Sequence, residues 1–459
     1  MNEQEKQFIL SHLNDDVRKL ALSKTPDGVN LRFVLEQIDG RQRAKTKLPS
    51  LAANPDIIFP VHLSVEQCSS EATAAYKAQV IMTSPSPSTG GVLVVDGSSN
   101  SSPVGRSGGV LIDLTGGFGV DFIALSKLFG KAIYVERNAE LCAIAEQNFQ
   151  TLNLTNTQIV NAEAESFLKL LTPPTLPIGE ESQVKGGITS SPPVEGLGEV
   201  VFFADPARRS ESGSRTYAIS DCTPDILQLL PVLKKHVPPP IAAANSSLFT
   251  LHSSLLFLKL SPMLDWHKAV EDIQEQGVNV SEVHIVSVKN ECKELLLLVE
   301  LQSAPQPAFR LFCVNDESIL EITATVPSLS SEGERTFLLL PNASIMKAGC
   351  WDFLISRFGV TQADPNSHIF FSDHEIADFP GKQYRIQAVC TMNKKELRNA
   401  LKDITHANIA VRNFPLSADA LRKRLKLKDG GDTYIFGTTI QGEHKLIVAT
   451  PSNLPTKEE

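Results

Sequence analysis

Residues 111–121 read LIDLTGGFGVD, and this stretch decides the fold because it joins a buried strand to a helix through a glycine-rich turn. The apolar residues 110–114 predict the strand, and residues 121–128 predict the helix. Glycines at such a turn let backbone N–H groups approach a ligand, because glycine tolerates a positive φ and has no Cβ to clash. The stretch therefore predicts a small-molecule site at the end of a strand.

The spacing of the glycines distinguishes between two kinds of cofactor site. A dinucleotide site needs the pattern G-x-G-x-x-G and places a pyrophosphate on the helix N-terminus. Here the spacing differs, and Asp113 puts a carboxylate just before the loop, where it suits a cationic or hydroxylated ligand and disfavours a pyrophosphate. The stretch therefore favours S-adenosyl-L-methionine over a nicotinamide dinucleotide as cofactor.

Two more acids follow the next two predicted strands. Glu136 comes directly after a strand at 132–135, where a carboxylate can accept both ribose hydroxyls of a nucleoside. Glu163 follows a strand at 158–160 and could accept the exocyclic amine of adenine. Each acid taken alone is also compatible with a helix N-cap or a solvated strand end. Taken together with Asp113, the two acids favour a nucleoside site.

The strand predicted at 200–204 exits into Asp205 and Pro206, followed by Arg208 and Arg209. A carboxylate before a proline, beside a methyl donor, can hold an amine or a ring N–H in place for in-line transfer. The arginines could bind a phosphate or a carbonyl, or pair with the acids around them. A proline turn with exposed arginines is the plainer alternative.

Strands and helices alternate between residues 110 and 301, which predicts a mostly parallel sheet with helices on both faces. Strands at 282–288 and 294–301 are close enough in sequence to pair antiparallel. The first eighty residues are predicted to be helical, with Ser69 and Ser70 as N-cap of a helix inside 65–80. Two Ser/Pro/Gly-rich insertions, near 83–109 and 172–198, interrupt the domain, and 92–95 predicts a short strand in the first.

After residue 304 the pattern changes to a small α+β unit. Strands are predicted within 309–326 and a helix over 344–358. From 381 to 428 there are 12 Lys or Arg residues and 3 acids, whereas the whole chain has a formal net charge of -9. Such a strip contacts nucleic-acid phosphates and positions an RNA without reading its sequence; a solvated basic helix is the alternative. The residues singled out for this contact are Arg412, Arg422, Lys423 and Arg424.

The composition of the 459 residues, 42% hydrophobic and 21% charged, is that of a globular protein. The N-terminus carries acids early and has no long apolar run, so we expect a cytoplasmic protein without a membrane span. The seven cysteines lie far apart, which suggests neither a zinc cluster nor a disulfide framework, and we expect no metal. Cys292 is not placed like a catalytic nucleophile, so carbon methylation through a covalent adduct is disfavoured.

The chain resembles class I S-adenosylmethionine-dependent methyltransferases, and its layout resembles the bacterial family with a C-terminal THUMP-like domain. The phrases that carry the resemblance are EQCSSEATAAYKA (66–78), DLTGGFGVD (113–121), ADPARR (204–209), KLSPMLD (259–265), NECKELL (290–296), PNASIMKAG (341–349) and NIAVRNFPLSADALRKRLKLKDGGDTYIFGTT (408–439). One departure is Thr115, which stands where many methyltransferases have the first glycine.

The resemblance implies an α/β fold with a Rossmann-like class I methyltransferase sheet, an N-terminal helical segment, and small C-terminal ferredoxin-like and THUMP-like α+β domains. The implied boundaries are 1–81, 82–304, 305–380 and 381–459. Asp205 and Pro206 would form the catalytic motif. The cofactor would be held by residues of the loop and the strand ends: Asp113, Thr115, Gly116, Gly117, Phe118, Gly119, Asp121, Glu136 and Glu163.

The resulting functional hypothesis is an S-adenosylmethionine-dependent methyltransferase (EC 2.1.1.-) that methylates a nitrogen of a base in tRNA or rRNA. Lys259 and Ser261, in the segment KLSPMLD, are expected to line the substrate side together with Arg208 and Arg209, although a simple proline turn is an equal alternative. The alternatives are a methyltransferase for small molecules or proteins, and a catalytically silent RNA-binding protein.

Overall fold

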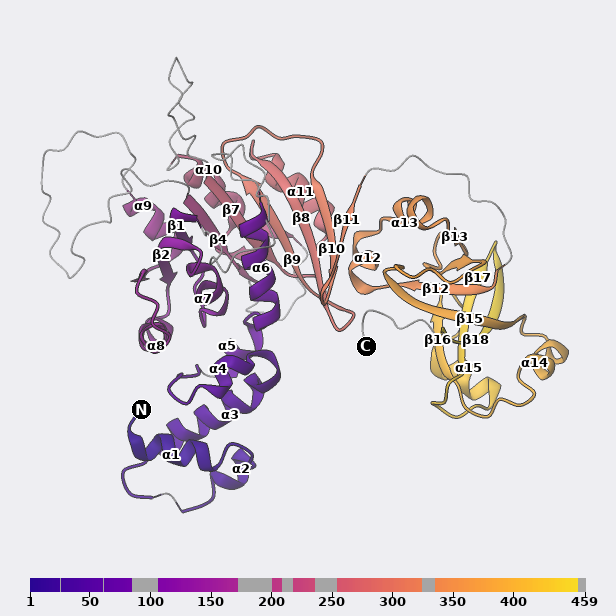
Figure 1. Ribbon diagram of the computed structural model, residues 1–459, viewed down its shortest axis with the longest axis horizontal. Coiled ribbons are helices and arrows are strands. Elements are labelled where there is room, and N and C mark those ends of the chain that lie inside the picture. Colours follow the sequence, from indigo (N-terminus) through magenta and orange to yellow (C-terminus); the bar gives the residue numbers. More distant parts are fainter. Residues whose placement is uncertain are drawn as a thin grey trace, which may run out of the picture. The chain divides into compact units, whose positions relative to one another are not determined.

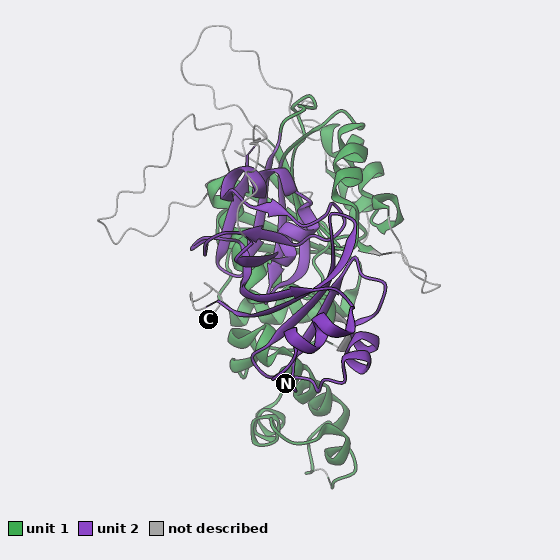
Figure 2. Ribbon diagram, turned by 90° about the vertical axis from the view of Figure 1, so that its right-hand side faces the viewer, with its two compact units in different colours: residues 1–281, 296–308 green, residues 282–295, 309–459 purple. Residues whose placement is uncertain are grey.

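The computed structural model describes residues 1–24, 26–60, 62–84, 106–171, 200–208, 218–235, 254–323 and 335–452. They form two compact units, one of residues 1–281 and 296–308 and one of residues 282–295 and 309–459 (Figure 2). Most of both insertions, including the strand expected at 92–95, lies outside the described residues. Within the described ranges, no helix has both the length and the apolar character needed to cross a bilayer.

Helices make up the first eighty residues, as expected. They are α1 (Glu3–Ser11), α2 (Val17–Leu20), α3 (Leu31–Lys47), α4 (Pro49–Ala53), α5 (His62–Gln67) and α6 (Glu71–Thr83). Ser70 is the N-cap of α6, because its hydroxyl accepts a hydrogen bond from the backbone N–H of Thr73. In α3, the buried Arg41 donates to the carbonyls of Ala52, Asn54, Pro55 and Ile57, and this fixes the turn after α4.

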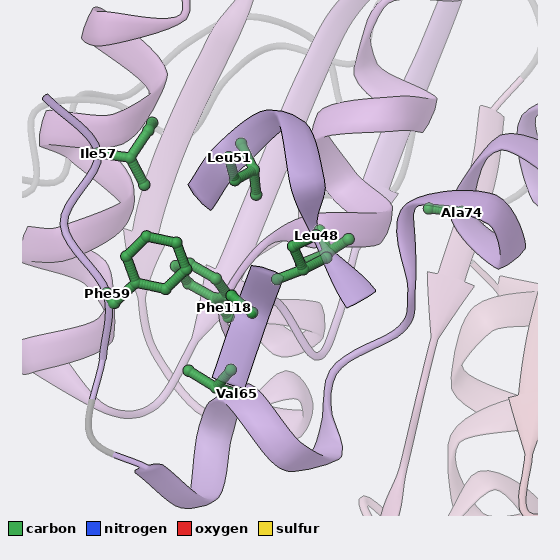
Figure 3. Packing of buried hydrophobic residues seen from close by; sticks show 9 residues of the cluster. Leu48, Leu51, Ile57, Phe59, Val65, Ala74 and Phe118 are labelled. Carbon is green, nitrogen blue, oxygen red and sulfur yellow. The ribbon is translucent and has the colours of Figure 1, made fainter. Parts of the chain in front are cut away.

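The helical segment packs onto the glycine-rich loop of the α/β region. Phe118 of that loop lies in one apolar cluster with Leu48, Leu51 and Phe59 (Figure 3). The rings of Phe59 and Phe118 are 5.5 Å apart. Asn148 adds a polar tie, because its side chain bonds both the N–H and the carbonyl of Ile58 at 2.8 Å. The helical segment is therefore part of the first compact unit and not a detached extension.

The α/β region alternates strands and helices (Figure 1). Its elements are β1 (Arg106–Asp113), α7 (Val120–Ser126), β2 (Phe129–Glu136), α8 (Ala139–Thr151), β3 (Thr157–Asn161), α9 (Ala164–Leu170), β4 (Val200–Ala204), β5 (Ala207–Arg208), the 3-10 turn η1 (Ile219–Asp221), β6 (Cys222–Thr223), α10 (Ile226–Lys235), β7 (Ser254–Leu260), α11 (Trp266–Gln274), β8 (Asn279–Val288) and β9 (Glu291–Glu300). The large sheet has the order β11-β10-β8-β9-β7-β4-β1-β2-β3, and β7, β4, β1, β2 and β3 are parallel neighbours.

The second unit contains β10 (Arg310–Asn315), β11 (Ser318–Ile322), β12 (Phe337–Pro341), α12 (Ala343–Ala348), α13 (Trp351–Phe358), β13 (Thr361–Gln362), β14 (Phe370–Ser372), β15 (Gly381–Cys390), α14 (Lys394–Ala400), β16 (Asn408–Arg412), α15 (Ala418–Leu425), β17 (Tyr434–Ile440) and β18 (Glu443–Pro451). Its second sheet has the order β13-β14-β12-β15-β18-β17-β16. Because β12 pairs antiparallel with β15, the regions expected as two small domains share one continuous sheet.

Two expectations need correction, and a third is confirmed. The strands expected in a connector after residue 304 are β10 and β11, and β10 pairs in parallel with β8 of the large sheet. The single helix expected over 344–358 is two helices, because Gly349 adopts φ 67° and ends α12. The antiparallel pairing of β8 and β9 is confirmed: Lys289 and Asn290, both at positive φ, form the two-residue turn between these neighbours.

Candidate active site

The site residues gather where the strand order of the large sheet reverses. From β1 the chain proceeds outward to β2 and β3, and β4 then returns to the other side of β1. In open α/β sheets, ligands bind outside the carboxyl ends of the strands at such a point. Asp113 ends β1, Glu136 ends β2, and Asp205 directly follows β4. The three predicted acids therefore lie at one edge of the sheet.

Backbone hydrogen bonds fix the glycine-rich loop to β2. Gly116 N–H donates to the carbonyl of Val135, and the hydroxyl of Tyr134 donates to the carbonyl of Gly117. A Cβ at Gly116 would lie 2.2 Å from the Tyr134 ring, so glycine is required by this close approach. Gly119 has φ 82° and is the N-cap of α7. These contacts hold the loop against β2.

Glu136 is oriented by two backbone donors. Gly117 N–H donates to Oε2 at 2.9 Å, and Asn138 N–H donates to Oε1 at 2.8 Å. Each carboxylate oxygen can accept more than one hydrogen bond, so both retain capacity for hydroxyl donors of a ligand. This geometry fits a carboxylate that binds a ribose.

Asp113 is almost completely buried, with 1% of its surface exposed. Its Oδ1 accepts the backbone N–H of Thr115 at 2.9 Å. Burial raises the pKa of Asp113 well above its ordinary value, and the neighbouring carboxylates add to the rise against the opposing N–H of Thr115. A cation beside this carboxyl would reverse part of that rise, because opposite charge favours ionisation.

Thr115 connects the loop with the exit of β4. The backbone N–H of Asp205 donates to the Thr115 hydroxyl at 2.7 Å. Thr115, the residue at which the sequence departs from the expected glycine, therefore ties the two loops together through its side chain. Asp205 is 35% exposed, and its Oδ2 lies 2.5 Å from Nζ of Lys259. Burial raises the pKa of Asp205, although Lys259 opposes the rise.

The second oxygen of the Asp205 carboxylate, Oδ1, has no hydrogen-bond partner among the residues that the structure describes. Pro206, directly after it, is buried. A carboxyl group held by Lys259 through Oδ2, whose Oδ1 has no partner in the described ranges, can accept an N–H of a substrate at Oδ1. This arrangement suits the positioning of an amine or a ring nitrogen.

A buried chain of charges continues from Lys259 into the N-terminal helical segment. Lys259 Nζ lies 3.9 Å from Oδ2 of Asp121, and Lys77 Nζ lies 3.0 Å from Oδ1 of the same carboxylate. The hydroxyl of Ser69 donates to Asp121 Oδ2 at 2.7 Å. Burial acts to raise the pKa of Asp121, but the two ammonium groups outweigh it and hold that pKa below its ordinary value.

Sequence reasoning missed Ser69, Lys77 and Tyr134 as site residues. Lys77 is completely buried, on the α6 face that also carries Thr73 and Val80. A lysine in the buried stripe of a helix is rare unless it is paired. Its position in the sequence could therefore have predicted a buried ion pair. The hydroxyl of Tyr134, in an apolar strand, likewise required a partner.

The other predicted residues occupy different surroundings. Glu163 is 54% exposed and lies 3.9 Å from Arg137. The Phe118 side chain belongs to the apolar cluster with Phe59. Arg208 lies in β5, and Arg209 lies outside the described residues. Ser261 Oγ accepts the N–H of Met263 in the turn after β7.

Most basic residues of the stretch 381–428 lie on or next to α14 and α15, two helices that pack on one apolar cluster of the second sheet. Leu397 of α14 and Leu421 of α15 both contribute to that cluster. The exposed bases on and next to these helices are Lys394, Lys395, Arg398, Lys402, Lys423, Arg424, Lys426 and Lys428, called here the basic surface. None of them forms an ion pair with another residue of the described ranges.

Two of the bases predicted to contact RNA differ from this group. Arg422 is bonded to Asp419 at 3.1 Å and to Asp429 at 2.6 Å, so its charge is compensated locally. Arg412 is exposed at the end of β16.

Comparisons with known proteins agree with this architecture. Residues 337–380 match a family described as a ferredoxin-like domain, and residues 381–451 match the THUMP domain-like family. A crystal structure of a candidate methyltransferase from Porphyromonas gingivalis W83 superposes with a TM-score of 0.72 at 24% identity, over 99% of this chain and 100% of that chain.

Two further crystal structures match less than half of the chain. One is a candidate methyltransferase from Streptococcus mutans in complex with SAH, at 15% identity and a TM-score of 0.26, over 43% of this chain and 90% of that chain. The other is a SAM-dependent methyltransferase from Aquifex aeolicus, at 14% identity and a TM-score of 0.26, over 43% of this chain and 84% of that chain. No curated protein matches the sequence.

The expected fold class is confirmed by the parallel sheet and by the match over the full chain. The expected C-terminal modules are confirmed by the two family matches. The chain therefore has the class I methyltransferase fold, followed along the sequence by ferredoxin-like and THUMP-like domains.

Proposed function

We propose that this protein transfers a methyl group from S-adenosylmethionine to a nitrogen of an RNA base. The observation that carries the proposal is the hydrogen bond from the backbone N–H of Asp205 to the Thr115 hydroxyl, because it holds the segment that carries the Asp205 carboxylate against the loop expected to hold the donor. Methyl transfer by in-line displacement depends mainly on such positioning, with modest acid–base assistance.

The residues present fit the cofactor. The Glu136 carboxylate is aimed by two backbone donors, and Asp113 offers a carboxyl at the strand end. Glu136 would accept the ribose hydroxyls, and Asp113 with the loop would hold the amino acid portion. When bound, the cofactor would supply an electrophilic methyl group.

Asp205 would orient the acceptor. Its free oxygen, Oδ1, would accept an N–H of the base, while Lys259 holds Oδ2 and favours the ionised form. In this way the nitrogen lone pair is turned toward the methyl group, and the proton that the nitrogen releases has an acceptor.

The basic surface would supply the contact with RNA. Its lysines and arginines are exposed and lack local partners, so phosphates can replace their counterions. The THUMP domain-like match over 381–451 supports an RNA substrate over a small molecule or a protein.

The test is the transfer of tritium from methyl-labelled S-adenosylmethionine to the RNA, protein and small-molecule fractions of a lysate from cells that lack this chain. We expect label in the RNA, and ribonuclease treatment should release it. Label that resists ribonuclease and yields to protease would identify a protein substrate instead. Absence of transfer to every fraction would favour a catalytically silent RNA-binding protein.

A further inference from the structure

We propose that Lys77, on the N-terminal helix α6, is a positioning residue for methyl transfer, because it holds Asp121 and so leaves Lys259 bound to Asp205. This inference rests on the proposed function, in which the Asp205 carboxylate orients the methyl acceptor. It assigns to the helical segment a part in catalysis beyond packing.

Four groups of alternating charge form the chain Lys77, Asp121, Lys259 and Asp205. The Nζ–Oδ distances along it are 3.0 Å, 3.9 Å and 2.5 Å. The side chain of Lys77 is 0% exposed and that of Asp121 is 9% exposed, so water cannot replace either partner. Ser69, directly before the N-cap of α6, donates to Asp121 Oδ2 and lies 3.0 Å from Lys77 Nζ.

The distances show which carboxylate Lys259 pairs with. Lys259 lies between two carboxylates and is much closer to Asp205 than to Asp121. The ionised Asp121 carboxylate is stable without a closer Lys259, because Lys77 pairs with it and the Ser69 hydroxyl donates a hydrogen bond to it. If Lys77 lost its charge, Asp121 would be a buried carboxylate whose only remaining ammonium partner is Lys259 among the described residues. Lys259 would then be drawn toward Asp121 and away from Asp205.

The charged groups that face Asp205 come from several elements. Lys259 on β7 and Lys77 on α6 act to lower its pKa, whereas Asp121 on α7 acts to raise it. The carboxyl of Asp113 on β1 also interacts with Asp205. The thiol of Cys68 has its pKa raised to about 11 by burial, so it is neutral at physiological pH. Loss of the Lys77 charge should therefore raise the pKa of Asp205.

The experiment compares Lys77→Met, Asp121→Asn and the double variant Lys77→Met with Asp121→Asn. In the single Lys77 variant, kcat should fall about tenfold to a hundredfold, because the Asp205 carboxylate is no longer held in place by Lys259. The acid limb of the pH–rate profile should move to higher pH. In the double variant no buried charge is left unpaired, so kcat and the acid limb should return toward wild type. The matched control is Lys127→Met, at the exposed C-cap of the helix that carries Asp121.

A second readout does not depend on the RNA substrate. The pKa of Asp205 is followed by NMR in protein with carboxyl-labelled aspartate, and Asp205→Asn identifies the signal. We expect that pKa to rise in Lys77→Met and to return in the double variant. An unchanged pKa would overturn the inference even if the wild-type enzyme methylates RNA. Lack of RNA methylation by wild type, with the pKa shifts present, would refute the proposed function and leave standing only the coupling of Lys77 to Asp205 through Asp121 and Lys259.

Thermal melts establish which variants are folded. If Lys77→Met does not fold, Ser69→Ala tests the same connection, because it removes the hydroxyl shared by Lys77 and Asp121. A smaller shift of the Asp205 pKa in the same direction is then expected. A folded Ser69→Ala protein with wild-type pKa and kcat would contradict the positioning role.

Discussion

The methyltransferase-fold region and the THUMP-like region use charge in opposite ways. Around the switch point, Lys77 and Asp121 are buried and paired, and Asp113 is buried against the backbone N–H of Thr115. On the basic surface, Lys423 and Arg424 are exposed and lack partners among the described residues. Buried charges act at short range and fix geometry, whereas exposed charges add to a field that salt screens within about 8–10 Å. The comparison separates residues that orient a reaction from residues that attract a substrate.

The largest effect is expected from Asp205→Asn. The amide keeps the shape but loses the negative charge that would orient the acceptor, so kcat should fall about 10²- to 10⁴-fold. Calorimetry should show nearly unchanged affinity for S-adenosylmethionine. Asp39→Asn is the matched control, because Asp39 is 31% exposed and bonded to Arg43 at 2.8 Å. Unchanged turnover in Asp205→Asn would remove Asp205 from the reaction.

Glu136→Ala should have the next largest effect, and on the cofactor alone. Loss of one charge-assisted hydrogen bond costs about 1.5–3 kcal/mol, which corresponds to a roughly 10- to 150-fold higher Kd. Isothermal titration with S-adenosylmethionine measures the change. Glu140→Ala, an exposed carboxylate in the first turn of α8, serves as control. Equal affinity in wild type and Glu136→Ala would exclude Glu136 from the site.

A smaller, salt-dependent effect is expected on the basic surface. The double variant Lys423→Ala with Arg424→Ala should raise the KM for RNA several-fold and reduce the salt slope of binding by about 2, one unit for each lost phosphate contact. Arg422→Ala should change RNA binding less, because Asp419 and Asp429 already compensate that charge. Binding measured over a series of salt concentrations tests both. An equal loss from Arg422→Ala would break the distinction between paired and unpaired bases.

The smallest effect concerns stability at Asp113. Its pKa is raised in the folded state, so its contribution to stability is fully present below the unfolded pKa of about 3.9 and is lost as pH rises through the folded value. At higher pH the ionised Asp113 carboxylate is buried, which destabilises the folded state. Asp113→Asn removes this destabilisation, and the amide oxygen still accepts the Thr115 N–H. The variant should therefore unfold at a higher temperature than wild type at pH 7, and the difference should shrink toward pH 4. A difference independent of pH would show that Asp113 does not titrate as inferred.

The strand ends of the candidate site could be predicted from the sequence because parallel strands bring their carboxyl ends to one edge. Asp113, Glu136 and Asp205 each follow an apolar run, and the structure places all three at the switch point. The link from α6 to the site could not be predicted, because the approach of Lys77 to Asp121 depends on how two helices pack.

Other features depended on contacts distant in sequence. The pairing of β10 with β8 joins residues 310–315 to 282–287, and no local pattern specifies that register. Similarly, Arg422 belongs to a run of bases in the sequence, but Asp429 folds back beside it. A charge count alone therefore overstates how many of these bases are available to RNA.

The most direct test of the account is mass spectrometry of modified nucleosides in RNA from cells with this chain, without it, and with Asp205→Asn in its place. The account predicts one N-methylated nucleoside that is present with the wild-type chain and lost in the other two. An identical set of methylated nucleosides in all three would contradict it.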